Sequence, residues 1–198
     1  ADDSVVLDGG GGDGIYQSTA NVTNFVSANG SGEYSVTNVD AVTLSSIDLN
    51  EVWSGWTLVV IYSAPDGVFA TRTLYDGFVP VVNTTATTPV NITIPDSPTH
   101  VTTLGLWVYE GDFDDAGDSL TFDGSSIFDA NNPVDNVFNS SSTRFGALIT
   151  AGTPALSGEP DSMASYDLDL FDASSLVQPL QSNMVDVSIS TTTDTVYW

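Results

Sequence analysis

The chain has 198 residues and a formal net charge of −24, because 26 acidic residues face only two basic ones, Arg72 and Arg144. Recognition of phosphate groups needs basic side chains, so this charge excludes nucleic acid and anionic membrane surfaces as partners. Cysteine is absent, which excludes disulfides and thiolate metal sites, and no apolar run of about 18 residues predicts insertion into a membrane.

The first part of the chain predicts short strands separated by turns. A glycine-rich loop at residues 9–14 lacks the Lys and Ser/Thr of a phosphate-binding loop, so we expect no nucleotide there. Residues 21–26 predict one helical turn. Strand patterns occur at residues 4–7, from residue 15, at 33–37 and at 41–47.

Residues 55–62, Gly-Trp-Thr-Leu-Val-Val-Ile-Tyr, form the strongest strand pattern in the chain. Both faces of this strand would be apolar, which is typical of a strand that is covered on both sides in the middle of a sheet. Pro65-Asp66-Gly67 predicts a turn, and residues 68–75 predict the returning strand. We therefore expect a central hairpin over residues 55–75.

The second part of the chain continues the same alternation of strands and turns. Residues 173–180 predict one helical turn, and the polar residues 123–144 show little periodicity. Strands are expected at residues 78–82, 90–94, 101–109, 120–122, 145–149, 166–171, 184–190 and 195–198. The fold class predicted is all-β: a two-sheet antiparallel sandwich, jelly-roll or Ig-like, of about ten to twelve short strands, as a single domain over residues 1–198.

The densest acidic segment, residues 110–118, is a candidate metal site. Carboxylate oxygens suit Ca²⁺, which is the one cofactor we expect, and Gly117 permits a sharp turn. The spacing only partly matches a helix-loop-helix calcium loop, because Ala116 stands at a ligand position and no helices flank the segment. A solvated acidic turn is the alternative. The candidate ligands are Asp112, Asp114, Asp115, Asp118 and Asp123.

Five sequons make N-glycosylation a further expectation for a protein at the cell surface. They begin at Asn21, Asn29, Asn83, Asn91 and Asn139. No catalytic constellation accompanies them. His100 is the single histidine and has no Gly-x-Ser-x-Gly partner, so we predict that the protein is not an enzyme.

Several short motifs follow one another in a characteristic order. They are Ser35–Val39, Gly55–Tyr62, Leu74–Phe78, Glu110–Asp112, Gly117–Leu120, Asn132-Pro133, Phe138–Ser140, Asp167–Asp169 and Thr191–Asp194. Together they resemble an uncharacterised β-sandwich domain of large surface proteins from archaea, notably methanogens, and from some bacteria, over roughly residues 3–198. This resemblance implies an extracellular location, a structural role and no catalytic residues.

The resemblance and the composition lead to two hypotheses. The first is a structural subunit of an extracellular, self-assembling cell-envelope structure (a sheath, surface layer or filament) whose partners are copies of itself. The second is a calcium-dependent module that binds carbohydrate or mediates adhesion, with glycans as partners. Members of the resembled family usually open with an additional apolar strand, so a terminal segment of another copy, residues 3–7 or 194–198, is expected to fill its place. The alternative is a fold that closes without that strand.

Overall fold

The computed structural model of the chain describes residues 3–8, 14–39, 54–65, 67, 70–94, 100–150, 157–163, 165–178 and 180–198. Contacts divide the chain into two compact units, residues 1–41 and residues 42–198. The β-sandwich predicted for residues 1–198 lies in the second unit. The predicted strand at residues 41–47 falls outside the described residues.

The first unit consists of a hairpin and a short helix. Strand β1 (Asp3–Asp8) pairs antiparallel with β2 (Gly14–Thr19), as the sequence predicts. Helix α1 (Thr23–Asn29) follows, and Gly30 ends it with a positive φ of 66°. The strand predicted at residues 33–37 is not formed, and these residues lie in no ladder of the described chain.

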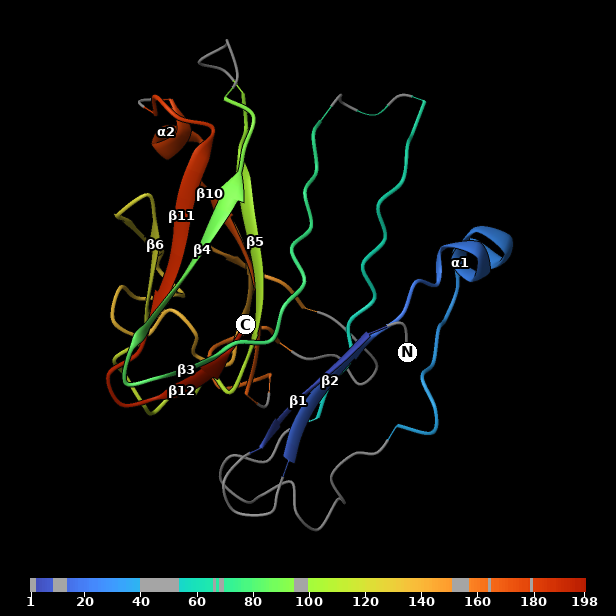
Figure 1. Cartoon of the computed structure of the whole chain (residues 1–198), viewed down its shortest axis with the longest axis horizontal. Helices are drawn as coiled ribbons and strands as arrows, with labels where there is room; N and C mark the ends of the chain where they lie inside the picture. Colours follow the sequence, from blue (N-terminus) through green and yellow to red (C-terminus); the bar gives the residue numbers. More distant parts are fainter. Residues whose placement is uncertain are drawn as a thin grey trace. The chain divides into compact units, whose positions relative to one another are not determined.

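The second unit holds two sheets (Figure 1). In the described residues, the larger sheet has six strands in the order β3-β12-β5-β10-β8-β9, and the smaller has four in the order β4-β11-β6-β7. The larger contains β3 (Pro80–Val82), β5 (Thr103–Tyr109), β8 (Ser142–Arg144), β9 (Ala147–Leu148), β10 (Tyr166–Asp172) and β12 (Thr195–Tyr197). The smaller contains β4 (Thr85–Asn91), β6 (Ser119–Phe122), β7 (Ser125–Ile127) and β11 (Met184–Ser190). Among the strands of the described residues most pairings are antiparallel, whereas β8 and β10 pair in parallel.

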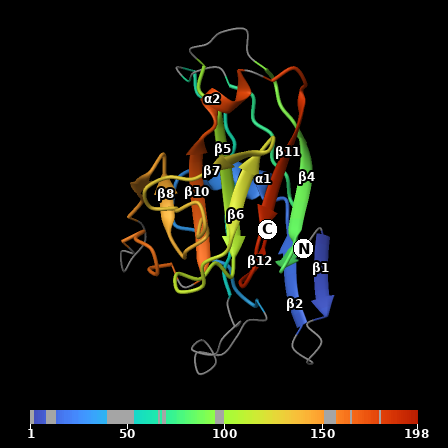
Figure 2. The ribbon, with the colours of Figure 1, turned by 90° about the vertical axis from the view of Figure 1, so that its left-hand side faces the viewer.

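The hydrophobic core lies between these two sheets, so the fold is the predicted all-β sandwich. Inward side chains alternate along the longer strands, as in β11, where Val185, Val187 and Ile189 are buried. The short helix α2 (Ser174–Val177) adds Val177 to the core. Figure 2 shows β6, β11 and β4 nearer the viewer and β5 and β10 behind them. The core also includes Val81, Leu106, Val108, Leu120, Phe122, Phe138, Phe171 and Val196.

The predicted central hairpin at residues 55–75 is wrong in this structure. Residues 54–65 and 70–79 run as extended chain but form no strand with one another in the described residues, and Figure 1 draws them without arrowheads. The apolar side chains are exposed rather than covered: 51% for Trp56, 61% for Ile61 and 79% for Tyr62. The sequence pattern predicts that both faces of this segment are buried, but it does not identify the part of the protein, or the partner, that buries them.

The C-terminal segment closes the sandwich of its own chain. Strand β12 pairs with β3, and Val196 is fully buried in the core. Trp198 extends this pairing, because its N–H and carbonyl group both bond to Val79. Residues 194–198 are therefore not a free donor strand, which corrects that part of the strand-exchange expectation. Residues 3–7 likewise pair within their own chain, with β2.

Candidate functional site

Strand β10 places two aspartates on the inner face of the sandwich. Asp167 lies opposite Val108 of β5, and Asp169 lies opposite Leu106. Directly opposed residues of an antiparallel pair point to the same face, and both β5 residues belong to the core. The two carboxyl groups are therefore directed inward, and both residues are buried.

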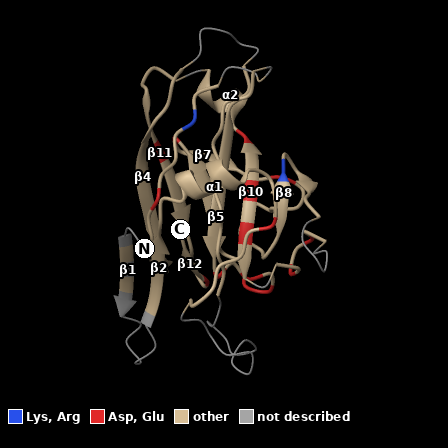
Figure 3. Cartoon of the chain, turned by 90° about the vertical axis from the view of Figure 1, so that its right-hand side faces the viewer, with Lys and Arg blue, Asp and Glu red and all other residues tan. Residues whose placement is uncertain are grey.

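Two more buried aspartates lie directly before strands of the two sheets. Asp118 directly precedes β6, and Asp194 directly precedes β12. The charge of Asp118 acts on both Asp167 and Asp194, so these carboxyls lie near one another. We call Asp118, Asp167, Asp169 and Asp194 the buried carboxylate centre. It draws on both sheets, and Figure 3 shows acidic residues gathered on β10 and the loops beside it.

A polar segment covers this centre and binds it through backbone N–H groups. The bonds run from Phe138 N to Asp118 Oδ2 (2.7 Å), from Asn139 N and Ser141 N to Asp167 Oδ1 (both 3.0 Å), and from Thr143 N to Asp169 Oδ1 (3.0 Å). A carboxylate is an acceptor for several N–H groups, so aspartates are suited to hold the irregular residues 138–141 and the start of the short strand β8 that follows them. The aspartates thus attach residues 138–143 to the two sheets.

Side chains of residues 129–132, which precede the covering segment, extend its hydrogen-bond network. Asp129 Oδ1 accepts hydrogen bonds from the N–H groups of Asn131 (2.9 Å) and Asn132 (3.1 Å), which forms a local turn. Asn132 is fully buried; its Nδ2 donates to Thr143 Oγ1 (2.8 Å) and its Oδ1 accepts from Ser141 Oγ (3.0 Å). The polar composition of this segment therefore reflects a buried network.

Each aspartate of the centre uses one carboxylate oxygen and leaves the other without a donor. The fourth member, Asp194, accepts a bond from Thr195 N at Oδ1 (2.6 Å). Within the described part of the chain, no hydrogen-bond partner reaches the buried atoms Asp118 Oδ1, Asp167 Oδ2, Asp169 Oδ2 and Asp194 Oδ2. Buried acceptors without a partner are rare because leaving one costs roughly 1–3 kcal/mol, and more when the group is charged.

Burial raises the pKa of all four carboxyls. It raises the pKa of Asp118 to about 6, although N–H bonds from Phe138 and Val137 oppose it. Burial also raises the pKa of Asp169 and of Asp194 to about 7 each. The pKa of Asp167 lies well above its ordinary value, through burial first and the charge of Asp169 second. Near neutral pH the centre must therefore hold protons or be neutralised by a cation.

The chain has few basic side chains that could neutralise these carboxylates. Lysine is absent, and both arginines are exposed. The Arg72 side chain donates to the Thr71 carbonyl, and the Arg144 guanidinium lies 5.5 Å from the centre of the Phe145 ring. A buried carboxylate without an opposite charge is strongly destabilising.

The structure separates the five predicted metal ligands into two groups. Asp118 belongs to the buried carboxylate centre, and the half-buried Asp112 lies near Asp194, on which its charge acts. Asp114, Asp115 and Asp123 are exposed. Among the described residues, no three acidic or histidine side chains come close enough together to hold a metal ion by themselves.

The sequence did not identify Asp167, Asp169 and Asp194 as site residues. The alternating pattern Tyr-Asp-Leu-Asp-Leu-Phe of β10 predicts a strand, and hydrophobicity alone would place its leucines inside. In the structure Leu168 and Leu170 are half-buried, and the alternating Asp167 and Asp169 are fully inside. Phe171, which shares the inner face with both aspartates, is the signal that fixes this orientation.

Four of the five predicted glycosylation sites are exposed: Asn21, Asn29, Asn83 and Asn91. The fifth, Asn139, is buried, and its Nδ2 donates to the Asn131 carbonyl (2.7 Å). A glycan attaches at that nitrogen, so the folded chain has no room for one at Asn139. His100 is half-buried, and its Nδ1 lies 3.2 Å from Gln178 Nε2.

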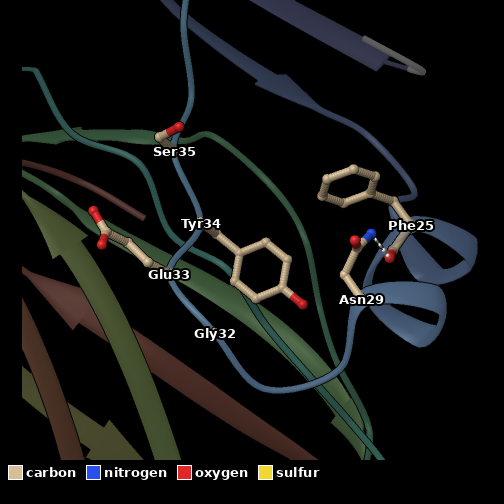
Figure 4. A pocket seen from close by; sticks show the side chains of 6 residues that line it. All are labelled: Phe25, Asn29, Gly32, Glu33, Tyr34 and Ser35. Atoms are coloured by element: carbon tan, nitrogen blue, oxygen red, sulfur yellow. Dashed lines mark hydrogen bonds between the residues drawn. The ribbon is translucent and has the colours of Figure 1, made fainter.

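The first unit carries a hollow of about 340 Å³ between α1 and the segment that follows it (Figure 4). Phe25 and Tyr34 line it and meet edge to face, with ring centres 6.0 Å apart. Glu33 supplies its one charged side chain.

No family model matches the chain, and neither the curated proteins nor the solved structures contain a significant match to it. The resemblance to archaeal surface proteins therefore stays a prediction. In the described residues, no helix has the length and apolar character needed to cross a bilayer.

Proposed function

We propose that this protein is a structural subunit of an extracellular, self-assembling cell-envelope structure, such as a sheath, surface layer or filament. Its copies are joined by pairing of β-strands. The observation that supports this proposal is the extended apolar segment at residues 54–65, whose side chains are exposed in the single chain.

The composition of this segment favours association. No charged residue or proline occurs from Gly55 to Ala64, and valine, isoleucine and aromatic residues dominate. Soluble proteins protect an exposed strand with charge, proline or a bulge, because an unprotected apolar strand pairs with other chains. A segment that is unprotected over ten residues is therefore expected to be covered in the working form of the protein.

Strand β5 of the larger sheet also has one side that is largely unpaired in the described residues. Strand β5 pairs with β10 along its whole length, but on its other side it meets β12 only at Tyr109. On the side away from β10, the backbone N–H and carbonyl groups of residues 103–108 therefore bond to no described strand. Thr57 Oγ1 lies 2.7 Å from the Tyr166 hydroxyl on β10, so the apolar segment starts close to this sheet.

A second copy of the chain is the occupant we propose for this surface. It would cover residues 54–65 with an identical apolar segment, and strand pairing would satisfy the backbone of both. The C-terminal strand does not serve this purpose, because it is held in its own core. The exposed sequons at Asn83 and Asn91 are consistent with a glycosylated protein outside the cell.

The test places one charge on the apolar segment. We expect the variant Ile61→Lys to remain monomeric at concentrations at which the wild type forms large particles. Sedimentation velocity measures the particle size, and negative-stain microscopy shows whether tubes, sheets or fibres form. The matched control is Met184→Lys, which adds the same charge at an apolar residue of similar exposure, 47% against 61%, on β11.

Two outcomes would count against the proposal. One is assembly of Ile61→Lys that equals the wild type. The other is a wild-type chain that stays monomeric at all concentrations and binds glycans, which would favour the carbohydrate-binding module. The exposed Trp56 is the residue that such a module would present to a sugar ring.

A further inference from the structure

Two aspartates of the buried carboxylate centre come from different elements, lie near each other and each keep one carboxylate oxygen without a partner in the described residues. Asp118 is 0% exposed and Asp167 is 1% exposed, and each has one buried carboxylate oxygen with no partner in the described residues. The backbone between them brings them together: Phe138 N binds Asp118, and the next N–H, that of Asn139, binds Asp167. The two carboxylates are therefore held on neighbouring peptide groups.

Gly111 lies directly beside one of these carboxylates. A Cβ atom added there would lie 2.2 Å from Asp167 Oδ2 and 2.8 Å from the Phe138 carbonyl oxygen. Both oxygens thus lie close to this glycine, and the Cβ atom of any other residue would collide with them. The adjoining Asp118 presents its own free oxygen from the start of β6 in the other sheet.

We propose that Asp118 Oδ1, Asp167 Oδ2 and the Phe138 carbonyl bind one Ca²⁺ ion between them. The donor set consists of oxygen only and mixes carboxylate with backbone carbonyl, which is the coordination that Ca²⁺ accepts in irregular geometry. Two carboxylates supply the charge, and water completes the shell, which agrees with the absence of a three-carboxylate group in the described residues.

This ion would join the two sheets at one end of the sandwich. Asp118 belongs to the start of β6 in the smaller sheet, whereas Asp167 belongs to β10 in the larger one. The ion would also neutralise carboxylates that the protein cannot neutralise with lysine. The site belongs to the single subunit, so the inference does not depend on the proposed assembly.

The test is calcium binding to the complete chain, measured by isothermal titration and by the shift of the melting temperature at constant ionic strength. We expect one saturable Ca²⁺ ion per chain and a rise in melting temperature. Asp118→Asn and Asp167→Asn should each abolish both signals. Asparagine keeps an oxygen for the N–H bond that each aspartate accepts and replaces the free oxygen with an NH₂ group that cannot bind a cation.

The matched control is Asp114→Asn, which removes one charge from an exposed residue of the same acidic segment. It should bind Ca²⁺ as the wild type does. Calcium signals that survive in both Asp118→Asn and Asp167→Asn, or that are lost in Asp114→Asn, would overturn the assignment. If a variant fails to fold, the wild-type titration decides: no saturable ion in 150 mM NaCl, on the order of physiological ionic strength, would refute the site.

Discussion

The raised pKa of Asp169 predicts an unusual pH dependence of stability. Burial, with a smaller effect of the charge of Asp129, raises the pKa of Asp169 to about 7, against hydrogen bonds from Thr143. Below about pH 4 the carboxyl is protonated in both the folded and the unfolded chain. As pH rises, the unfolded chain loses this proton first, so the folded state loses stability until pH passes the folded pKa.

The size of this effect follows from the two pKa values. With about 3.8 in the unfolded chain and about 7 in the folded one, linkage gives a destabilisation of about 2 kcal/mol at pH 5 and about 4 kcal/mol at pH 7.5. Asp169→Asn removes this titration but keeps an acceptor for the Thr143 N–H group. The variant should therefore gain about 2 kcal/mol relative to the wild type between pH 5 and pH 7.5.

The assay is urea unfolding at both pH values in the presence of a chelator, followed by tryptophan fluorescence. The measured quantity is the difference in unfolding free energy between variant and wild type, compared at the two pH values. The new buried NH₂ group lowers the stability of the variant equally at both pH values, so its effect cancels in this comparison. The control is Asp172→Asn on the same strand. Asp172 is exposed, and bonds from Ser174 lower its pKa, so this variant should gain nothing at pH 7.5. A difference for Asp169→Asn that does not change with pH would refute the reasoning.

Three further predictions concern the fold. Deletion of residues 194–198 should lower the melting temperature of the subunit itself, because it removes the buried Val196 and a strand of the larger sheet; an unchanged melting temperature would contradict this. Gly111→Ala should destabilise the chain, since its Cβ would lie 2.2 Å from a carboxylate oxygen, whereas Gly32→Ala, with nothing within 4 Å, should be neutral in the same thermal scan. Glycopeptide mass spectrometry should find Asn139 unmodified in the folded protein, and a glycan there would show that this segment is not buried.

The alternating segments of the sandwich could be predicted from the sequence. Strand β11 was expected at residues 184–190 and occupies Met184–Ser190, because one face is clearly apolar and the other polar. The helical turn of α2 and the strands β5, β6 and β12 also fall within or close to the expected ranges. In such segments the local pattern of apolar and polar residues is enough to predict the strand, because it indicates both the period and the buried face.

The predictions that are wrong or incomplete concern segments whose environment depends on distant parts of the chain. Residues 55–62 are apolar on both faces, and the sequence cannot tell whether cover comes from the same subunit or from another. The sequence predicts the strand at residues 166–171 but not the burial of its aspartates, because that burial depends on N–H groups of residues 139–143 that the sequence shows only as a polar stretch. A cluster of acidic residues in the sequence therefore predicts only part of the site, because the buried aspartates are dispersed along the chain.

Hydrogen–deuterium exchange of the backbone amides at residues 55–62 tests the central claim most directly. If copies pair through this segment, its amides should exchange rapidly in the monomer and become strongly protected in the assembled material, together with those amides of residues 103–108 in β5 that do not bond to β10. Amides in β11, which is already paired on both sides, should be protected in both states and serve as the internal reference. Equal exchange of residues 55–62 in monomer and assembly would contradict the proposal that strand pairing at this segment joins the subunits.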